Sequence, residues 1–207
     1  MEVQGTTIAE RRTSSQGTEA ALLSLPGLVL IQPKSFGDER GFFLETYHRD
    51  RYAEFGITAD FVQDNLSFSA HGVQRGLHFQ APGAQAKLVS VVTGAVFDVA
   101  VDIRVGSPTF GRWAAVHLTG ENHRQFFIPR GFAHGFCVIS ETAHFSYKCD
   151  AYYAPAQEHV IHFQDPDIGI VWPMALPKVS AKDAAGLRLR DFSTERLPQY
   201  LEREAWS

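Results

Sequence analysis

The chain has 207 residues, of which 44% are hydrophobic and 20% are charged, a composition typical of a soluble globular protein. The net charge of −4 argues against a nucleic-acid-binding protein, which usually carries a basic face. No stretch approaches the roughly 20 apolar residues that a membrane span needs, so we expect one domain with a substantial core, no nucleic-acid partner and no membrane partner.

Residues 1–24 are rich in Thr, Ser, Glu and Gln and lack the apolar segment of a signal peptide. We expect them to form a flexible leader, and we expect the protein to be cytoplasmic. The two cysteines, Cys137 and Cys149, lie in apolar, strand-like sequence and are interpreted as free buried thiols in a reducing compartment.

From Leu28 onward, short apolar runs alternate with Gly and Pro, a pattern typical of strands and turns. A turn over Asp38–Gly41 and a short helix over Arg49–Phe55, ended by Gly56, are predicted within this series. Strands are predicted over residues 28–31, 42–47, 61–65, 73–80, 87–93, 95–103, 113–119, 124–128, 136–139, 143–149 and 159–163.

The clearest strand is 95–103, in which apolar side chains alternate with Asp98, Ala100 and Asp102. Many short strands without alternating helices indicate an all-β fold, either a sandwich, a barrel or a jelly roll. No repeat or linker divides the body of the chain. We therefore expect the leader at 1–24, one β domain over 25–180, and a helical or irregular segment over 181–207 that packs on it.

A cation and an imidazole lie close together in the run Arg75–Gln80. Arg75 and His78 are three residues apart, so a regular strand would point them to opposite faces. A bulge at Gly76 would bring both into one pocket, and we predict such a bulge. Lys87 begins the next apolar strand, where it either extends to water or enters the same pocket. The three together indicate a site that binds an anionic substrate and moves a proton.

The run Pro129–Phe136 has the Pro-x-Gly-x-x-His spacing found in metal-binding cupin barrels. Those barrels also supply a His-x-His pair, but here Gln80 stands where the second histidine would be. A catalytic metal usually needs three protein ligands. The sequence therefore predicts no metal site.

Taken together, these runs resemble the dTDP-4-dehydrorhamnose 3,5-epimerase family over residues 25–183. The resemblance is carried by Asp38–Glu45, Gln63–Asn65, Arg75–Gln80, Val101–Arg104 with Ser107–Gly111, Pro129–Phe136, Tyr147–Cys149 and Ser180–Asp183. It implies a cupin-type jelly-roll β-barrel with a few short flanking helices, a homodimer, a dTDP-sugar substrate and no cofactor.

The resemblance also implies roles for individual residues. His78 would be the base and Asp183 its partner, Tyr147 the acid on the opposite face of the sugar, and Lys87 the cation that stabilises an enolate. The implied substrate-binding residues are Gln63, Asp64, Asn65, Arg75, His134, Tyr153, Glu158 and Lys182, with Arg40 and Glu45 contributed by the neighbouring subunit.

Four functions are compatible with these residues. The first is epimerisation of dTDP-4-dehydro-6-deoxy-D-glucose at C3 and C5, and the second is inversion of only one of these carbons. The third is a non-catalytic nucleotide-sugar-binding cupin, and the fourth is a metal-dependent cupin oxygenase. Exchange of sugar protons with solvent separates the first two from the third, and bound stoichiometric iron or zinc would indicate the fourth.

Overall fold

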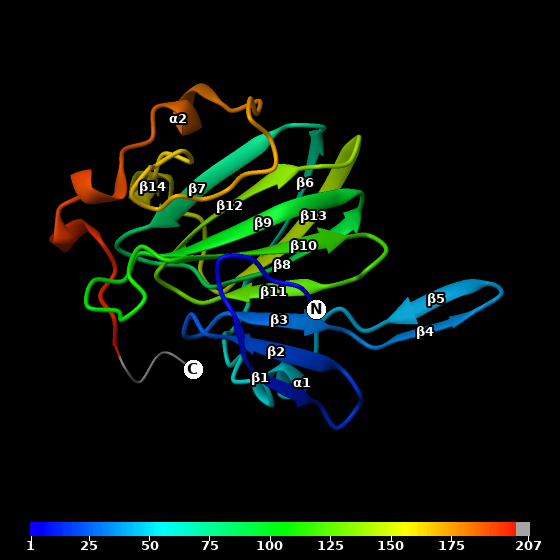
Figure 1. Cartoon of the computed structure of the whole chain (residues 1–207). Helices are drawn as coiled ribbons and strands as arrows, with labels where there is room; N and C mark the ends of the chain where they lie inside the picture. The colour runs from blue at the N-terminus through cyan, green and yellow to red at the C-terminus, as the bar shows by residue number, and fades with distance from the viewer. Residues whose placement is uncertain (202–207) are drawn as a thin grey trace.

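Two antiparallel sheets pack face to face in the computed structural model, which describes residues 1–201 (Figure 1). The larger sheet has seven strands in the order β1-β2-β3-β11-β8-β13-β6, and the smaller has five in the order β10-β9-β12-β7-β14. This arrangement confirms the prediction of an all-β protein.

The seven-stranded sheet consists of β1 (Ile8–Thr13), β2 (Glu19–Leu23), β3 (Val29–Gln32), β6 (Gln63–Ala70), β8 (Lys87–Thr93), β11 (Gln125–Ile128) and β13 (Thr142–Cys149). The five-stranded sheet consists of β7 (Gln74–Gln80), β9 (Ala95–Asp102), β10 (Trp113–Thr119), β12 (Phe132–Val138) and β14 (Glu158–Val160). Each strand predicted from residue 61 onward overlaps one of these elements, and most of the differences are shifts of one to four residues at the ends.

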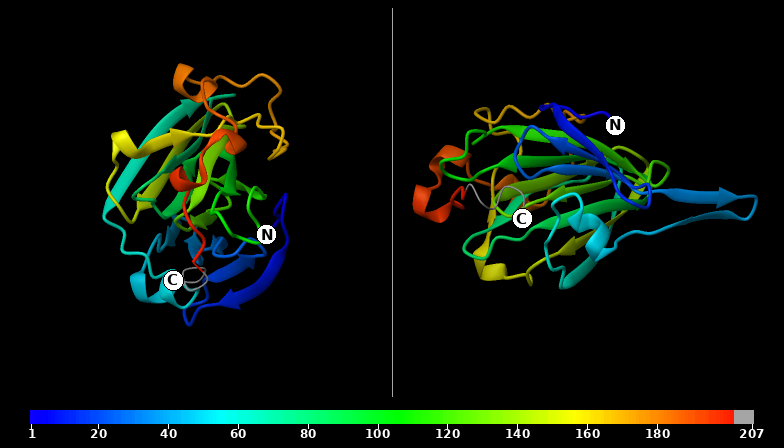
Figure 2. Two further views of the ribbon diagram at one scale, coloured as in Figure 1. Left: turned by 90° about the vertical axis from the view of Figure 1, so that its left-hand side faces the viewer. Right: turned by 90° about the horizontal axis from the view of Figure 1, so that it is seen from below.

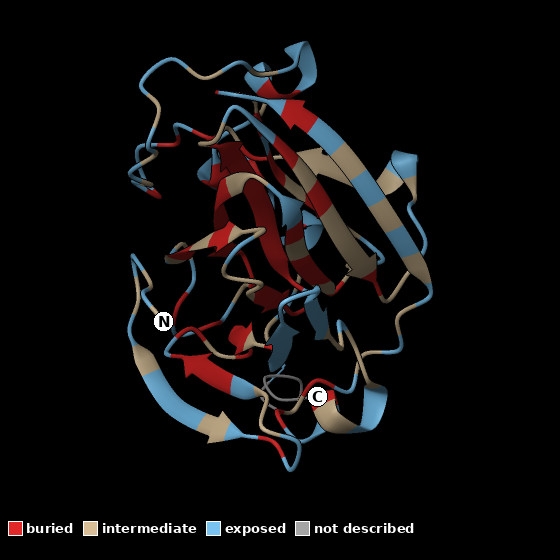
Figure 3. Cartoon of the chain, turned by 90° about the vertical axis from the view of Figure 1, so that its right-hand side faces the viewer, coloured by how far each residue is buried: buried red, intermediate tan, exposed pale blue. Residues whose placement is uncertain are grey.

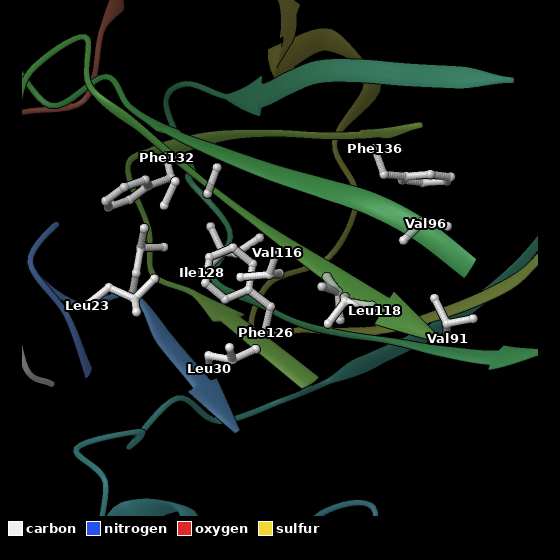
Figure 4. Packing of buried hydrophobic residues seen from close by; sticks show 14 of the residues in the cluster. Leu23, Leu30, Val91, Val96, Val116, Leu118, Phe126, Ile128, Phe132 and Phe136 are labelled. Carbon is white, nitrogen blue, oxygen red and sulfur yellow. The ribbon is translucent and has the colours of Figure 1, made fainter. Parts of the chain in front are cut away.

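The space between the sheets is filled by apolar side chains from both of them (Figure 4). Phe126 and Leu118, for example, are fully buried there. A second apolar cluster covers the outer face of the five-stranded sheet, where Phe97 and Val99 of β9 meet Ile168 and Phe192 of the C-terminal part. β9 is therefore buried on both faces, and its acidic residues Asp98 and Asp102 are completely buried as well.

The prediction of a flexible leader over 1–24 is wrong. β1 and β2 form a hairpin at the edge of the seven-stranded sheet, and residues 20–23 are almost completely buried. Gln4 also exchanges two backbone hydrogen bonds with Ala115 of β10, both 2.9 Å long. The polar composition of this segment reflects the edge strand β1, which is largely exposed, whereas the apolar residues of β2 next to it are buried.

A two-stranded hairpin of β4 (Ser35–Asp38) and β5 (Gly41–Leu44) extends away from the two sheets (Figures 1 and 2). The turn between its strands lies where it was predicted, but β4 was not foreseen and β5 ends three residues earlier than expected. The short helix α1 (Arg49–Ala53) follows, and Gly56 has a positive φ of 85° just after it. Buried residues are concentrated in the paired sheets, in contrast to the exposed hairpin (Figure 3).

The chain after Pro177 forms α2 (Ala181–Ala184) and the 3-10 turns η2 (Leu189–Asp191) and η3 (Thr194–Arg196). Leu189, Phe192 and Leu197 anchor this segment in the outer apolar cluster. Residues 202–207 of the predicted C-terminal segment lie outside the described residues. Among residues 1–201, no helix has the length and apolar character required to cross a bilayer.

Candidate active site

A cavity of about 340 Å³ opens between the two sheets, a volume typical of sites for small ligands. The seven-stranded sheet contributes one wall through β6, β8 and β13, and the five-stranded sheet contributes the other through β7, β12 and β14. The lining residues are Gln63, Asn65, Ser67, Arg75, His78, Phe79, Gln80, Gln85, Lys87, His134, Gly135, Phe136, Phe145, Tyr147, Cys149, Tyr153 and Glu158.

The predicted bulge at Gly76 is confirmed by the pairing of β7 with β12. His78 lies opposite His134 and Arg75 lies opposite Phe136, so β7 uses one more residue than its partner over this interval. Gly76 has φ of +99°, and a Cβ placed on it would lie 2.4 Å from the carbonyl oxygen of His134. Only glycine fits this close backbone contact, and as a result Arg75 and His78 both line the cavity.

His78 forms a close pair with a carboxylate. Its Nε2 lies 2.6 Å from Oδ1 of Asp183, which is only 3% exposed and belongs to α2. Ser180 caps this helix by accepting a hydrogen bond from the Asp183 N–H. Because an ionised carboxylate only accepts, Nε2 carries the proton of this pair, so Nδ1 is the nitrogen that has the lone pair in the neutral imidazole.

The pKa of Asp183 reflects its contacts more than its burial. Burial alone raises the pKa of this carboxyl, but the hydrogen bond and charge of His78, with hydrogen bonds from Ser180 and the Gly76 N–H, lower it below the usual value. Asp183 is therefore ionised at neutral pH, as its predicted role requires. The predicted pairing of His78 with Asp183 is present in the structure.

This low pKa predicts how stability depends on pH. A carboxyl whose folded pKa is depressed contributes its full stabilisation above its unfolded pKa of roughly 3.9, and loses it as pH falls through the folded value. We expect the contribution of Asp183 to the difference in unfolding free energy between the natural chain and Asp183→Asn to be fully present at pH 5. The difference should then shrink from pH 4 to 2. Urea unfolding at each pH measures this, and a difference that grows on acidification would contradict it.

Lys87 and Tyr147 enter the cavity from neighbouring strands, β8 and β13. Burial lowers the pKa of Lys87, an effect partly opposed by the nearby Cys149, Glu158 and Asp98. Burial also raises the pKa of Tyr147, so its phenol keeps its proton at neutral pH. The cavity therefore holds a partly desolvated amine and a phenolic proton donor.

His134 lines the same cavity, as predicted, and is held by a carboxylate that the sequence analysis did not assign to the site. Its Nε2 lies 2.9 Å from Oδ2 of Asp98, which is completely buried on β9. An acidic residue within an otherwise apolar strand was a visible signal, because such a residue is rarely buried without a partner. The site thus contains two imidazole–carboxylate pairs.

Tyr153 and Glu158 line the outer end of the cavity, and Lys182 contacts Glu158 from outside the lining. The Tyr153 hydroxyl donates to Oε2 of Glu158 across 2.8 Å, and the same oxygen pairs with the ammonium of Lys182. Burial raises the pKa of Glu158, but the hydrogen bonds from Lys182 and Tyr153 outweigh it, so the net shift is downward. Oε1 of Glu158 lies 3.9 Å from Nδ1 of His78, which connects this end of the cavity to the imidazole.

Five predicted site residues do not themselves line this cavity. Two of them, Asp183 and Lys182, pair with the lining residues His78 and Glu158, and the other three make their contacts elsewhere. Asp64 lies between two inward-facing residues of β6, so strand alternation turns it outward, where it pairs with Lys148 at 2.9 Å. The expected contact from Asp64 is therefore not supported. Arg40 pairs with Asp38 in the projecting hairpin, and Glu45 pairs with Arg51 of α1. Within one chain, neither of these two residues lines the cavity.

Within residues 1–201, no group of three or more His, Cys, Asp or Glu side chains is arranged to hold a metal ion. Cys137 and Cys149 are free and buried, as predicted.

Comparison with known proteins assigns the family. The sequence model described as dTDP-4-dehydrorhamnose 3,5-epimerase matches residues 22–191. The chain is 52% identical to dTDP-4-dehydrorhamnose 3,5-epimerase of Shigella flexneri over 169 residues, which is 81% of this chain and 93% of the relative. It is 44% identical to dTDP-4-dehydrorhamnose 3-epimerase of Streptomyces niveus, covering 82% of this chain and 83% of the relative.

The fold is also similar to solved structures of sugar-nucleotide epimerases. The crystal structure of dTDP-6-deoxy-D-glucose-3,5-epimerase from Legionella pneumophila in complex with dTDP-4-keto-L-rhamnose superposes with a TM-score of 0.86 at 53% identity. The match covers 89% of this chain and 99% of the Legionella chain. The chain therefore belongs to the dTDP-4-dehydrorhamnose 3,5-epimerase family of isomerases, which confirms both the resemblance found in its sequence and its cupin-type fold.

Proposed function

We propose that the protein epimerises dTDP-4-dehydro-6-deoxy-D-glucose at C3 and C5 to give dTDP-4-dehydro-L-rhamnose without a cofactor. The observation that carries this proposal is the position of its acid–base groups. His78 with Asp183 enters the cavity from the five-stranded sheet, whereas Tyr147 enters from the seven-stranded sheet. A base and an acid on opposite walls are what inversion of a carbon between them requires.

The chemistry follows from the C4 ketone of the substrate. Nδ1 of His78 takes the proton from C3 or C5, and the electron pair of the broken C–H bond forms an enolate on the ketone oxygen. The Lys87 ammonium stabilises this oxyanion, and the Tyr147 hydroxyl then returns a proton to the opposite face of the carbon. A positioned acid or base contributes about 10²- to 10⁴-fold, and preorganised charge at the oxyanion supplies a further large part.

The remaining predicted residues suit the nucleotide. The Arg75 guanidinium and the Lys182 ammonium are the cations for the diphosphate, with arginine able to make bidentate contacts. Tyr153, half-exposed at the outer end of the cavity, offers a ring to stack on the thymine. Gln63, Asn65 and His134 supply further polar groups on the cavity wall, and Glu158 supplies one beside Tyr153.

The direct test is incubation with dTDP-4-dehydro-6-deoxy-D-glucose in D₂O, followed by counting deuterium at each carbon. Label at both C3 and C5 with inverted configuration is expected. Label at one carbon would indicate a single-carbon epimerase, an alternative that the Streptomyces niveus relative named as a 3-epimerase supports. Binding of the substrate without label would indicate a non-catalytic nucleotide-sugar-binding protein.

We propose in addition that the protein is a homodimer, with Arg40 and Glu45 completing the partner's cavity. The hairpin that carries Arg40 projects from the two sheets (Figure 2). It exposes Phe36, Phe42 and Phe43, whose side chains are 56%, 63% and 70% accessible. Exposed aromatic side chains on a projecting hairpin are typical of an interface. The outer face of β6 is also apolar, with Leu66 and Phe68 exposed.

This proposal predicts the effect of removing the aromatic side chains. We expect the natural chain to have the mass of two chains by light scattering, and Phe42→Ser with Phe43→Ser to shift it toward one chain and to weaken epimerisation. Leu176→Ser is the control, because Leu176 is 90% exposed in a different segment. A natural chain with the mass of one subunit, or a variant that stays dimeric, would contradict the interface.

Cytoplasmic localisation remains part of the proposal. Its support is the two free buried thiols, which are the usual state of cysteines in a reducing compartment.

A further inference from the structure

The segment that carries Tyr153, residues 150–154, is held mainly by side chains of other segments. It follows β13 and precedes the short 3-10 turn η1 (Pro155–Gln157), and it has no regular secondary structure of its own. Three glutamines bind its backbone. Gln85 Nε2 donates to the Ala151 carbonyl across 2.6 Å, Gln63 Oε1 accepts from the Tyr153 N–H across 3.0 Å, and Gln80 Oε1 accepts from the Ala154 N–H across 2.9 Å.

The three glutamines come from three separate parts of the cavity wall. Gln63 begins β6, Gln80 ends β7, and Gln85 lies in the loop between β7 and β8. Gln80 is only 5% exposed, and its amide nitrogen also donates to the Gly83 carbonyl across 3.1 Å. Gln80 is therefore bonded through both ends of its amide, in an orientation that directs its oxygen at the Ala154 N–H.

The beginning of the segment is bound in a similar way. Asp150 has a buried side chain whose Oδ1 accepts from the Ala86 N–H across 2.7 Å and whose Oδ2 accepts from Arg130 across 2.7 Å. Together with the glutamines, this gives the segment bonds at residues 150, 151, 153 and 154. The Tyr153 ring is then fixed at both ends, by Gln63 at its backbone and by Glu158 at its hydroxyl.

We propose that Gln80 and Gln85, together with Gln63, are positioning residues that hold Tyr153 in place for stacking on the base of the nucleotide. This inference rests on the proposed function, which assigns the stacking to Tyr153. The physical reason is preorganisation: an irregular segment that must be ordered when the ligand binds weakens the affinity by the entropy of that ordering. Bonds that already fix the segment in the free protein remove this cost.

The proposal predicts that the glutamine variants lose affinity for dTDP but keep their kcat. Gln80→Ala and Gln85→Ala should each weaken binding of dTDP, measured by calorimetry, by about 3- to 10-fold, the effect of one neutral hydrogen bond. At saturating substrate, kcat should stay within about two-fold, because neither bond reaches the imidazole, the phenol or the ammonium. Gln199→Ala is the matched control, since Gln199 also donates to two backbone carbonyls, Thr194 and Leu197, but does so away from this cavity.

A double-mutant cycle distinguishes a positioning role from direct contact with the ligand. Tyr153→Ala should itself weaken dTDP binding by about 10-fold, in the range of base–aromatic stacking. In that background, Gln80→Ala and Gln85→Ala should change the affinity by less than about two-fold.

A full penalty that persists without the Tyr153 ring would show that the glutamines touch the ligand directly and would overturn the proposal. Unchanged affinity in both glutamine variants would also overturn it. Unchanged affinity in Tyr153→Ala would contradict the stacking assigned under the proposed function as well, and exchange in D₂O tests epimerisation independently of all these outcomes. Thermal unfolding by circular dichroism establishes that each variant is folded before its affinity is measured.

Discussion

Replacing His78 with alanine should remove exchange of both the C3 and the C5 proton of the substrate with solvent. The reason is that a single imidazole, oriented by Asp183 at 2.6 Å, is the proposed base at both carbons. Loss of a positioned base corresponds to a decrease of about 10²- to 10⁴-fold. The measurement is deuterium incorporation in D₂O, followed at each carbon by mass spectrometry and NMR.

Measuring the affinity for dTDP distinguishes the loss of the base from a loss of structure. The His78→Ala chain should bind dTDP nearly as well as the natural chain, because the nucleotide contacts are assigned to Arg75, Tyr153 and Lys182. His71→Ala is the matched control, since His71 is an exposed histidine whose ring bonds the Ser140 carbonyl outside the cavity. Exchange that persists at either carbon in His78→Ala would require a second base for that carbon.

The site around β7 could be predicted from sequence because its geometry depends on local rules. Strand alternation places Arg75 and His78 on opposite faces, and glycine between them permits the bulge that reverses this. The same alternation applied to Gln63–Asn65 would have turned Asp64 away from the cavity. The resemblance to the family included Asp64 as part of a motif, whereas the backbone geometry separates it from its two neighbours.

The N-terminal strands could not be predicted in the same way. β1 is an edge strand with exposed polar positions, so composition alone does not distinguish it from a flexible segment. It is held by the hairpin pairing with β2 and by the bridge between Gln4 and Ala115, which joins residues far apart in the sequence. Such contacts become visible only when the sheet is assembled.

Asp98, the carboxylate partner of His134, also depends on contacts that local pattern does not predict. The sequence showed Asp98 within an apolar strand, but its contact depends on the register between β9 and β12, in which Phe136 lies opposite Asp98. The roles predicted for Arg40 and Glu45 depend on the proposed partner subunit, because the hairpin that carries Arg40 projects away from the two sheets (Figure 2). Local pattern thus predicted the strand that carries Arg75 and His78, whereas the contacts between strands needed coordinates.

Replacing Tyr147 with phenylalanine should separate proton removal from inversion. The ring would remain in place beside Phe145, whose centroid lies 6.0 Å away, while the hydroxyl that returns the proton would be lost. His78 would still remove and return a proton on its own face, so deuterium should enter the substrate at C3 and C5. The inverted product should decrease by about 10²- to 10⁴-fold, the usual contribution of a positioned acid.

The measurement follows isotope exchange and product configuration in the same reaction by NMR. Burial raises the pKa of Tyr147 above its usual value of about 10, so the natural chain should not lose inversion through ionisation of this phenol between pH 7 and 9. Equal loss of exchange and inversion in Tyr147→Phe would assign the phenol to substrate binding or to the first proton transfer. Full inversion in Tyr147→Phe would mean that another group returns the proton. The nearest candidate wall is the same one, where β13 pairs with β8, the strand that carries Lys87.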